Sequence, residues 1–489
     1  MKLPTYIRLF TAFLISSLTS LEAQELKGTK PNIIIVITDD QGMGDLSCMG
    51  NQLLKTPLID SFHKGATRFS DFHVSPTCAP TRAALMSGRV AFKNGVTHTI
   101  LQRERMALST FTLPQALKTA GYSTGLFGKW HLGDEEEYLP QSRGFDEVIM
   151  HGAGGIGQTR LGDFPANGKN VYFDNVLLHN DTIVKTKGFC TDLFFNAGLA
   201  WIKKQHEAKH PYFAYISLNA PHGPFIAPEK YTKRFTELGC DERAAGRLGM
   251  IENIDDNFGQ LMAKLKEWKA LENTIVIFMT DNGAVKKGRT KKIPYFNAGM
   301  KGGKNSPNEG GSRVPFFIQW KGMLPQGADI KALAAHIDLY PTLGELAGVK
   351  LPSDVQKLDG RSLVPLLQNK EADWADRELF FNCGRWPTSQ REAFKYTKCA
   401  VRTQQWRLIN NTELYDISQD PGEKNNVASQ QPEVVQRLQK SYNTWWESVI
   451  PLMVNEDLPK VGADNQPFTK RYAKQLKEKG IPEWAPDSL

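Results

Sequence analysis

The chain has 489 residues, of which 40% are hydrophobic and 23% are charged, and its formal net charge is +8 at pH 7. This composition is that of an ordinary globular protein, and the length predicts one large domain with a smaller one. The positive charge is modest for the length and is not organised into a basic stripe interleaved with aromatic residues. We therefore expect no nucleic-acid partner and at most an anionic substrate.

Residues 1–24 have the pattern of a signal peptide. Lys2 and Arg8 precede an uncharged, largely apolar run from Leu9 to Leu21, which is too short to cross a bilayer. A buried N-terminal helix is the less favoured alternative, because a polar linker follows before the first clear strand. We expect a secreted or periplasmic protein that is processed near Ala23, with no later segment spanning a membrane.

The next 350 or so residues, 25–375, alternate short apolar runs with longer amphipathic ones, which is typical of an α/β domain. Continuous β-branched or aromatic runs predict strands buried on both faces of a largely parallel sheet, at Asn32–Thr38, Tyr212–Leu218 and Thr274–Thr280. Helices are expected between them, at Leu113–Thr119, Thr191–Lys204 and Arg243–Trp268. The pattern predicts a large mixed, mostly parallel sheet flanked by helices.

The pattern changes after about residue 375. Four shorter runs (ELFFNCG, KCAVRT, WRLINN and ELYDI) are followed by a helix from Pro432 to about Val449. Such an order predicts a smaller C-terminal subdomain, residues 376–450, in which an antiparallel sheet is capped by a helix. A polar tail, residues 451–489, follows it.

Polar side chains follow each of the three strongest strands. The first strand runs into Asp39-Asp40, the second into Asn219-Ala220-Pro221-His222 and the third into Asp281-Asn282-Gly283. Any one of these could be a helix cap or a turn. Because ligands collect at the carboxyl ends of the strands in open α/β sheets, three such runs together favour a binding site.

Three aspartates and one asparagine offer only oxygen ligands, which suit a hard divalent cation such as calcium or magnesium. Zinc prefers imidazole or thiolate ligands. A histidine after Asp281 would have added a nitrogen ligand and indicated a two-zinc site. Asn282 instead leaves an oxygen-only site for one metal ion.

The segment CAPTRAALMSGR predicts a helix that begins close to Cys78. Pro80 suits a helix first turn, and Gly88 is a plausible C-cap. A structural cysteine is one interpretation, and a papain-like nucleophile activated by the helix N-terminus is another. A thiol is a poor neighbour for a hard cation, which favours replacement of the sulfur by an oxygen function.

These residues resemble the type I, formylglycine-dependent sulfatases of the alkaline phosphatase superfamily. CAPTRAALMSGR is similar to their CxPxR signature, in which a maturation enzyme oxidises the cysteine to formylglycine. The resemblance runs from about Pro31 to about Val427. It takes in PNIIIVITDDQGMGDL, GKWHLG, APHGP, TDNG, KGGKNSPNEGGSRVP, HIDLYPTLGELAG and ELYDISQDPGEKNNV.

The resemblance implies one calcium ion per chain, bound by an oxygen of the modified Cys78 and by Asp39, Asp40, Asp281 and Asn282. It also implies that five further side chains contact the aldehyde hydrate, the sulfate or the ester oxygen: Arg82, Lys129, His131, His222 and Lys304. The family has another site residue after its GKWHLG-type motif. Here that region reads HGAGGIGQ, and His151 and Gln158 are the candidates.

The activity implied is hydrolysis of a sulfate ester by a hydrated aldehyde. One hydroxyl attacks sulfur, and the second allows the aldehyde to re-form and release sulfate. The most plausible substrate is a glycan or oligosaccharide sulfate. A phosphonate or phosphate monoester hydrolase of the same superfamily and a catalytically silent glycan-binding relative are the alternatives. Arg385 and Trp386, in the CGRWP turn, could contact a sugar or belong to the core.

Overall fold

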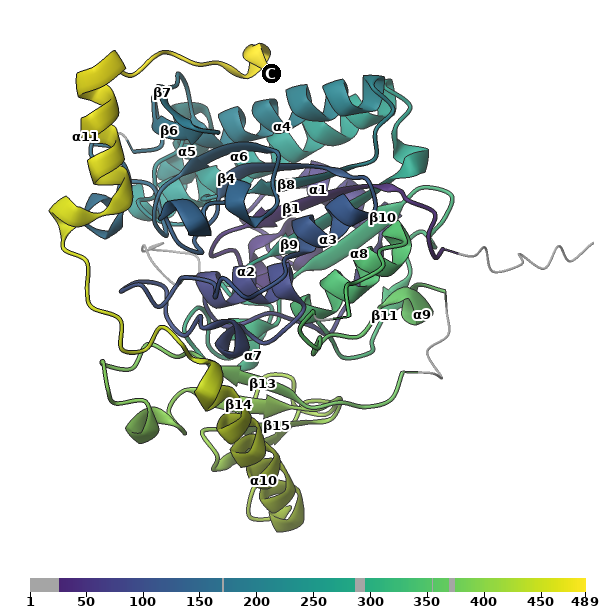
Figure 1. The fold of residues 1–489 in the computed structure, drawn as a ribbon. Helices are drawn as coiled ribbons and strands as arrows, with labels where there is room; N and C mark the ends of the chain where they lie inside the picture. The colour runs from purple at the N-terminus through teal and green to yellow at the C-terminus, as the bar shows by residue number, and fades with distance from the viewer. Residues whose placement is uncertain (1–25, 169–170, 286–294, 354, 369–373) are drawn as a thin grey trace, which may run out of the picture.

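The computed structural model describes residues 26–168, 171–285, 295–353, 355–368 and 374–489, and the predicted signal peptide lies outside them. A ten-stranded sheet forms the centre of the larger domain, and the smaller C-terminal sheet lies below it in Figure 1. Among the helices of these described ranges, none combines the length and the apolar character that a membrane crossing requires.

The central sheet is parallel in its middle, with antiparallel pairings on either side of these strands. Its strands lie in the order β11 (Asp329–Ile330), β2 (Thr67–Phe69), β10 (Phe316–Trp320), β9 (Thr274–Thr280), β1 (Asn32–Thr38), β8 (Tyr212–Ser217), β4 (Ser123–Lys129), β5 (Glu147–His151), β6 (Val176–His179) and β7 (Thr182–Lys185). The five strands from β9 to β5 are parallel, whereas β10, β6 and β7 run antiparallel to their neighbours. The predicted mixed, mostly parallel sheet is confirmed.

Helices cover both faces of the sheet, so the central strands are buried on both sides. Along β1, Ile33 and Ile35 pack into one hydrophobic core and Ile34 and Val36 into the other, as the two-residue period of a strand requires. One face carries α1 (Pro57–Gly65), α4 (Cys190–Glu207) and α6 (Glu242–Glu267), with α5 (Glu229–Glu237) against α6. The other carries α2 (Cys78–Ser87), α3 (Leu113–Thr119) and α8 (Leu339–Ala347).

The predicted elements agree closely with the observed ones. The three strands and the helix Leu113–Thr119 lie where the sequence predicts them, and the two longer helices differ by at most three residues at an end. The sequence pattern does not predict β2, β10 and β11 on one side of the sheet, because these strands are short and their pairing is set by contacts distant in sequence.

The C-terminal subdomain is an antiparallel four-stranded sheet, as predicted. Its strands are β13 (Leu379–Asn382), β14 (Cys399–Arg402), β15 (Trp406–Ile409) and β16 (Glu413–Asp416), and α10 (Pro432–Val449) packs on it. In the chain beyond it, helix α11 (Pro467–Lys479) returns to the edge of the central sheet. There Gln475 exchanges hydrogen bonds with the backbone of Ile183 on β7.

Candidate active site

The carboxyl ends of the adjacent strands β9, β1 and β8 bring the predicted polar residues together. Asp39 and Asp40 directly follow β1, and Asp281 and Asn282 directly follow β9. Asp40 adopts a left-handed backbone conformation (φ 65°), which few non-glycine residues do, and its N–H donates to Asp281 Oδ1 (3.2 Å). This turn fixes the two acidic segments to one another.

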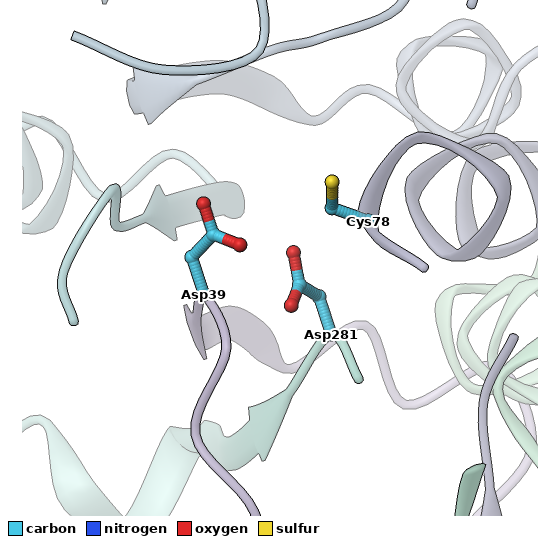
Figure 2. Close-up of side chains that lie close together, drawn as sticks. All are labelled: Asp39, Cys78 and Asp281. Atoms are coloured by element: carbon cyan, nitrogen blue, oxygen red, sulfur yellow. The ribbon is translucent and has the colours of Figure 1, made fainter. Parts of the chain in front are cut away.

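Cys78 is the first residue of α2 and faces this carboxylate pair. Thr77 caps the helix in an extended conformation, and Gly88 ends it in the left-handed conformation (φ 65°), as the sequence predicts. The Cys78 side chain is 2% exposed. Figure 2 shows its sulfur and the carboxylates of Asp39 and Asp281 directed into a common space, and their ligand atoms lie within 4.8 Å of one another.

Each of the three acids at the strand ends has a cationic partner. Lys129, the last residue of β4, places Nζ 2.6 Å from Asp39 Oδ2, and Lys304 Nζ lies 2.6 Å from Asp40 Oδ1. Arg82 on α2 donates from Nε and Nη2 to Asp281 Oδ2 (3.1 and 2.8 Å). The three carboxylates and three cations therefore balance, before any ligand is bound.

Burial and the neighbouring charges shift the pKa values of Asp39 and Asp281 in opposite directions. Burial, followed by the nearby Asp39 charge, raises the pKa of Asp281 to about 7 even though Arg82 lies beside it. For Asp39 burial acts in the same direction, but the charges of Lys129, His222 and Lys304 outweigh it and lower the pKa. Opposite pKa shifts of neighbouring carboxyl groups are typical of functional sites, because burial and nearby charges act on each carboxyl group to a different extent.

The site passes a test for a bound hard cation. Asp39 Oδ1 and Asn282 Oδ1 are buried and have no hydrogen-bond partner within the described ranges. The amide nitrogen of Asn282 donates to Asp40 Oδ1 (2.9 Å) and to the Gly283 carbonyl (3.0 Å), which leaves its oxygen as the free acceptor. Buried oxygens without donors are costly unless something positive satisfies them, and an oxygen-only set suits calcium or magnesium.

Two histidines flank the cluster. His131 has φ 64°, and its Nε2 lies 2.8 Å from the Thr99 carbonyl, so Nε2 carries the proton and the buried Nδ1 is left without a partner. Burial, and then the charge of Lys129, holds its pKa well below the usual range. His222 donates from Nδ1 to the Gly223 carbonyl (2.7 Å), and its Nε2 lies 3.9 Å from Asp40 Oδ2.

The two candidates for the further site residue lie beside this cluster. His151 is the last residue of β5, opposite Lys129 in the neighbouring strand, and is buried. A side chain at Gly155 would meet both Gln158 (3.2 Å) and His222 (3.3 Å), so Gln158 also lies beside the site. The structure brings both near the predicted residues.

Sequence reasoning misses two residues that hold the site together. Ser217, the last residue of β8, bonds to an Arg82 guanidinium nitrogen and donates to the Lys129 carbonyl (2.7 Å). Its position at a strand end is a signal that could have found it. Thr99, which holds His131, lies in a loop and carries no such signal.

Trp386 is 2% exposed and bonds to Glu456, which places its ring in the core.

The cluster opens into a cavity of about 1340 Å³. Asp40, His222 and Lys304 of the cluster line it, and Phe225, Arg243 and Arg385 are among its other lining residues. The cavity is therefore walled by cationic and aromatic side chains and has one acid, Asp40, among the described lining residues. Such a wall suits an anionic ligand that also has apolar faces.

A second group of possible metal ligands, Asp71, His73 and Glu309, is excluded as a metal site by its partners. Arg402 donates to Asp71 (2.9 Å) and to Glu309 (3.1 Å), and Arg407 donates to Glu309 (2.6 Å). These guanidinium groups pair with both carboxylates, and Arg313 Nη1 lies 3.6 Å from the other oxygen of Glu309, Oε2. The cluster is a buried ion-pair network between the C-terminal sheet and the larger domain.

Comparison with known proteins identifies the family. The model of the sulfatase family matches residues 31–349. The chain belongs to the sulfatase family. A second model, N-sulphoglucosamine sulphohydrolase, C-terminal, matches residues 304–447. As a sulfatase, the protein is a sulfuric ester hydrolase of the alkaline phosphatase-like superfamily, which confirms the enzyme class and fold predicted from the motifs.

Three similar proteins illustrate the relationship. N-acetylgalactosamine-6-sulfatase of Canis lupus familiaris is 30% identical over 387 residues, covering 72% of this chain and 69% of the relative. Arylsulfatase A of Homo sapiens is 30% identical over 486 residues, covering 87% and 89%. The crystal structure of Ps i-CgsB in complex with k-i-k-neocarrahexaose superposes with a TM-score of 0.75 at 29% identity, covering 92% of this chain and all of that one.

Proposed function

We propose that this sulfatase releases inorganic sulfate from a sulfated carbohydrate, using formylglycine made from Cys78 and one calcium ion. The observation that carries the proposal is the set of buried oxygens without donors, Asp39 Oδ1 and Asn282 Oδ1, beside Cys78 at a helix N-terminus. The carbohydrate substrate is supported by two similar proteins, one named N-acetylgalactosamine-6-sulfatase and one solved in complex with k-i-k-neocarrahexaose.

The calcium ligands would be Asp39, Asp40, Asp281 and Asn282, with an oxygen at position 78. Bound there, calcium supplies positive charge next to the sulfate, and the hydrated aldehyde supplies a hydroxyl nucleophile. Because Arg82, Lys129 and Lys304 already balance the three carboxylates, the dication leaves the site with a net positive charge. An anionic sulfate ester is the ligand that such a site stabilises.

The chain's own residues then orient the ester and move protons. Lys129, Lys304 and Arg82 bind the sulfate oxygens or the groups that hold them. Lys304 Nζ, or His222 Nε2 when the imidazole carries a second proton, donates a proton to the leaving ester oxygen from the wall of the cavity. His131, neutral and with Nδ1 free, accepts a proton when sulfate is released.

Two further parts of the proposal concern how the enzyme is made. A formylglycine-generating maturation enzyme would recognise the CxPxR context around Cys78. The signal-peptide pattern of residues 1–24 supports export, and so a secreted or periplasmic enzyme.

The test is sulfate release by the matured enzyme from defined substrates. A panel of singly sulfated mono- and oligosaccharides is compared with p-nitrophenyl sulfate and with the matched phosphate and phosphonate esters. We expect sulfate release from at least one carbohydrate, with a higher kcat/KM than for the aryl ester. Preferential turnover of the phosphonate or phosphate would favour the monoester hydrolase alternative, and glycan binding without any turnover would favour a silent relative.

A further inference from the structure

The cavity carries two guanidinium groups that the sulfatase chemistry does not use. Arg243, on α6, and Arg385, in the CGRWP turn of the C-terminal subdomain, both line it. In the part of the chain that the structure describes, neither forms an ion pair with a carboxylate; Arg243 lies against Phe225, at 5.9 Å from the ring centroid. By contrast, Lys304 in the same cavity is paired with Asp40.

The CGRWP turn is built to hold Arg385 in one place. Gly384 (φ 58°) and Arg385 (φ 64°) are both left-handed, and a Cβ on Gly384 would lie 1.8 Å from the Thr97 carbonyl. Asn382 accepts from the Gly384 N–H (2.7 Å), and the Arg385 N–H donates to Thr97 (3.2 Å). A left-handed arginine is unfavourable, and such conformations concentrate at functional sites.

One residue connects Arg385 with the proposed catalytic groups. Arg385 donates from Nη2 to the Thr99 hydroxyl (2.7 Å), while the Thr99 carbonyl holds His131 (2.8 Å). His98 accepts the N–H groups of Thr99 and Ile100 at Nδ1 (2.8 and 3.1 Å), which shapes this loop. The arginine is thereby placed beside the reaction centre without belonging to it.

The guanidinium has unused capacity to bind. Its Nε is buried and has no hydrogen-bond partner among the described residues. Burial, then the charges of Arg103 and Arg385, lowers the pKa of the neighbouring His98 to about 3, so that ring is neutral and adds no competing charge. A planar guanidinium without a carboxylate partner suits an oxyanion with two oxygens, such as a sulfate or a carboxylate.

The cavity is also larger than a single sulfated sugar needs. Its volume of about 1340 Å³ exceeds the roughly 300–1,000 Å³ of common small-molecule pockets. Since the C-terminal subdomain supplies Arg385 and the larger domain supplies Asp40 and Lys304, the ligand would bridge the two parts of the chain.

We propose that Arg385 forms a subsite for a second oxyanion of the substrate, a sulfate or carboxylate that is not the one hydrolysed. The proposal rests on the proposed carbohydrate sulfatase function and deepens it: the preferred substrate is a multiply anionic oligosaccharide. Arg385 selects this substrate and takes no part in breaking the S–O bond.

The test compares substrates that differ only in the second anion. Wild type, Arg385→Gln and Arg385→Asn are assayed on p-nitrophenyl sulfate, on a singly sulfated disaccharide, and on the same disaccharide with a second sulfate or with a carboxylate. Asparagine tolerates the left-handed backbone better than most residues, so it keeps the turn if glutamine strains it. Arg391→Gln, in the exposed loop that follows, is the matched charge control.

For both Arg385 variants we expect kcat/KM on the doubly anionic substrate to fall on the order of 10- to 100-fold, the range for losing hydrogen bonds to a charged group. Values for the two singly anionic substrates should stay unchanged, and Arg391→Gln should match wild type throughout. The sulfate and carboxylate arms show which oxyanion fits. An equal loss on the singly and doubly anionic substrates, or no loss on either doubly anionic one, would overturn the subsite.

A binding measurement separates this proposal from the proposed function. Calorimetric titration of the doubly anionic disaccharide is made into Cys78→Ala and into Cys78→Ala with Arg385→Gln. We expect weaker binding by a similar factor in the double variant, whether or not the wild type hydrolyses the sugar. Equal affinities contradict the subsite, whereas absence of carbohydrate turnover with unequal affinities contradicts only the proposed reaction.

Discussion

Replacing Glu309 by glutamine should loosen the contact between the C-terminal sheet and the catalytic loop. Glu309, the first residue of α7 (Glu309–Ser312), is fully buried and accepts from Arg402 (3.1 Å) and Arg407 (2.6 Å) on the C-terminal sheet. The loop that carries Lys304 leads directly into this helix. Removing the Glu309 charge leaves the buried guanidinium groups of Arg402 and Arg407 with less negative charge to balance them.

The expected loss is large because the ion pairs are buried. Removing one partner of a buried salt bridge typically destabilises a protein by about 3–5 kcal/mol. Urea unfolding followed by circular dichroism measures it, and Glu272→Gln is the control: its exposed pair with Lys321 has a similar separation (2.6 Å), so stability should hardly change. Sulfatase kcat/KM should also fall in Glu309→Gln, since the Lys304 loop loses its anchor.

The effect should depend on pH in a defined direction. Burial opposes ionisation of Glu309, but the charges of Arg402, His73 and Arg407 prevail and hold its pKa well below the ordinary value of 4.5. A carboxyl group whose pKa is lower in the folded protein stabilises the fold at pH values above its pKa in the unfolded chain. For Glu309 this contribution is lost as the pH falls below about 4.5. The difference in the free energy of unfolding between wild type and Glu309→Gln should therefore shrink as the pH falls below about 4.5. Equal stability of the two proteins at pH 7 would refute this reasoning.

Three further outcomes concern the site. Elemental analysis should find one calcium ion per chain, and Asp39→Ala or Asp281→Ala should abolish both calcium binding and activity. Two stoichiometric zinc ions would contradict the oxygen-only site. Asn282→His should weaken calcium binding without creating a zinc enzyme, and undiminished calcium-dependent activity would remove Asn282 from the ligands. Cys78→Ala should fold like wild type yet be inactive. The substitution removes a single sulfur atom at the first turn of α2, so the cavity that it leaves in the core is small.

The sequence predicts the site well where polar residues follow strands. Asp39, Asp40, Asp281 and Asn282 could be placed together because parallel strands end at the same edge of a sheet. Cys78 could be placed at a helix start because Pro80 and Gly88 delimit the helix. In both cases local sequence signals coincide with the geometry.

Other features depend on contacts distant in sequence and could not be predicted. Thr99 bonds to His131 and Arg385 from a loop in which Thr97 accepts the Arg385 N–H of the C-terminal turn. Trp386 resembles a sugar-binding residue in sequence, but its indole lies in the core against Phe92 and Trp446. Glu309 and its arginine partners meet only after the two sheets have packed.

Peptide mass spectrometry across VSPTCAPTR, combined with activity, tests the central claim most directly. The protein is made with and without a co-expressed maturation enzyme, and the formylglycine fraction at Cys78 is measured in each sample. We predict that sulfate-ester hydrolysis rises in proportion to that fraction and that unmodified protein does not turn over. Hydrolysis at the same rate by protein with an entirely unmodified Cys78 thiol would contradict the formylglycine mechanism.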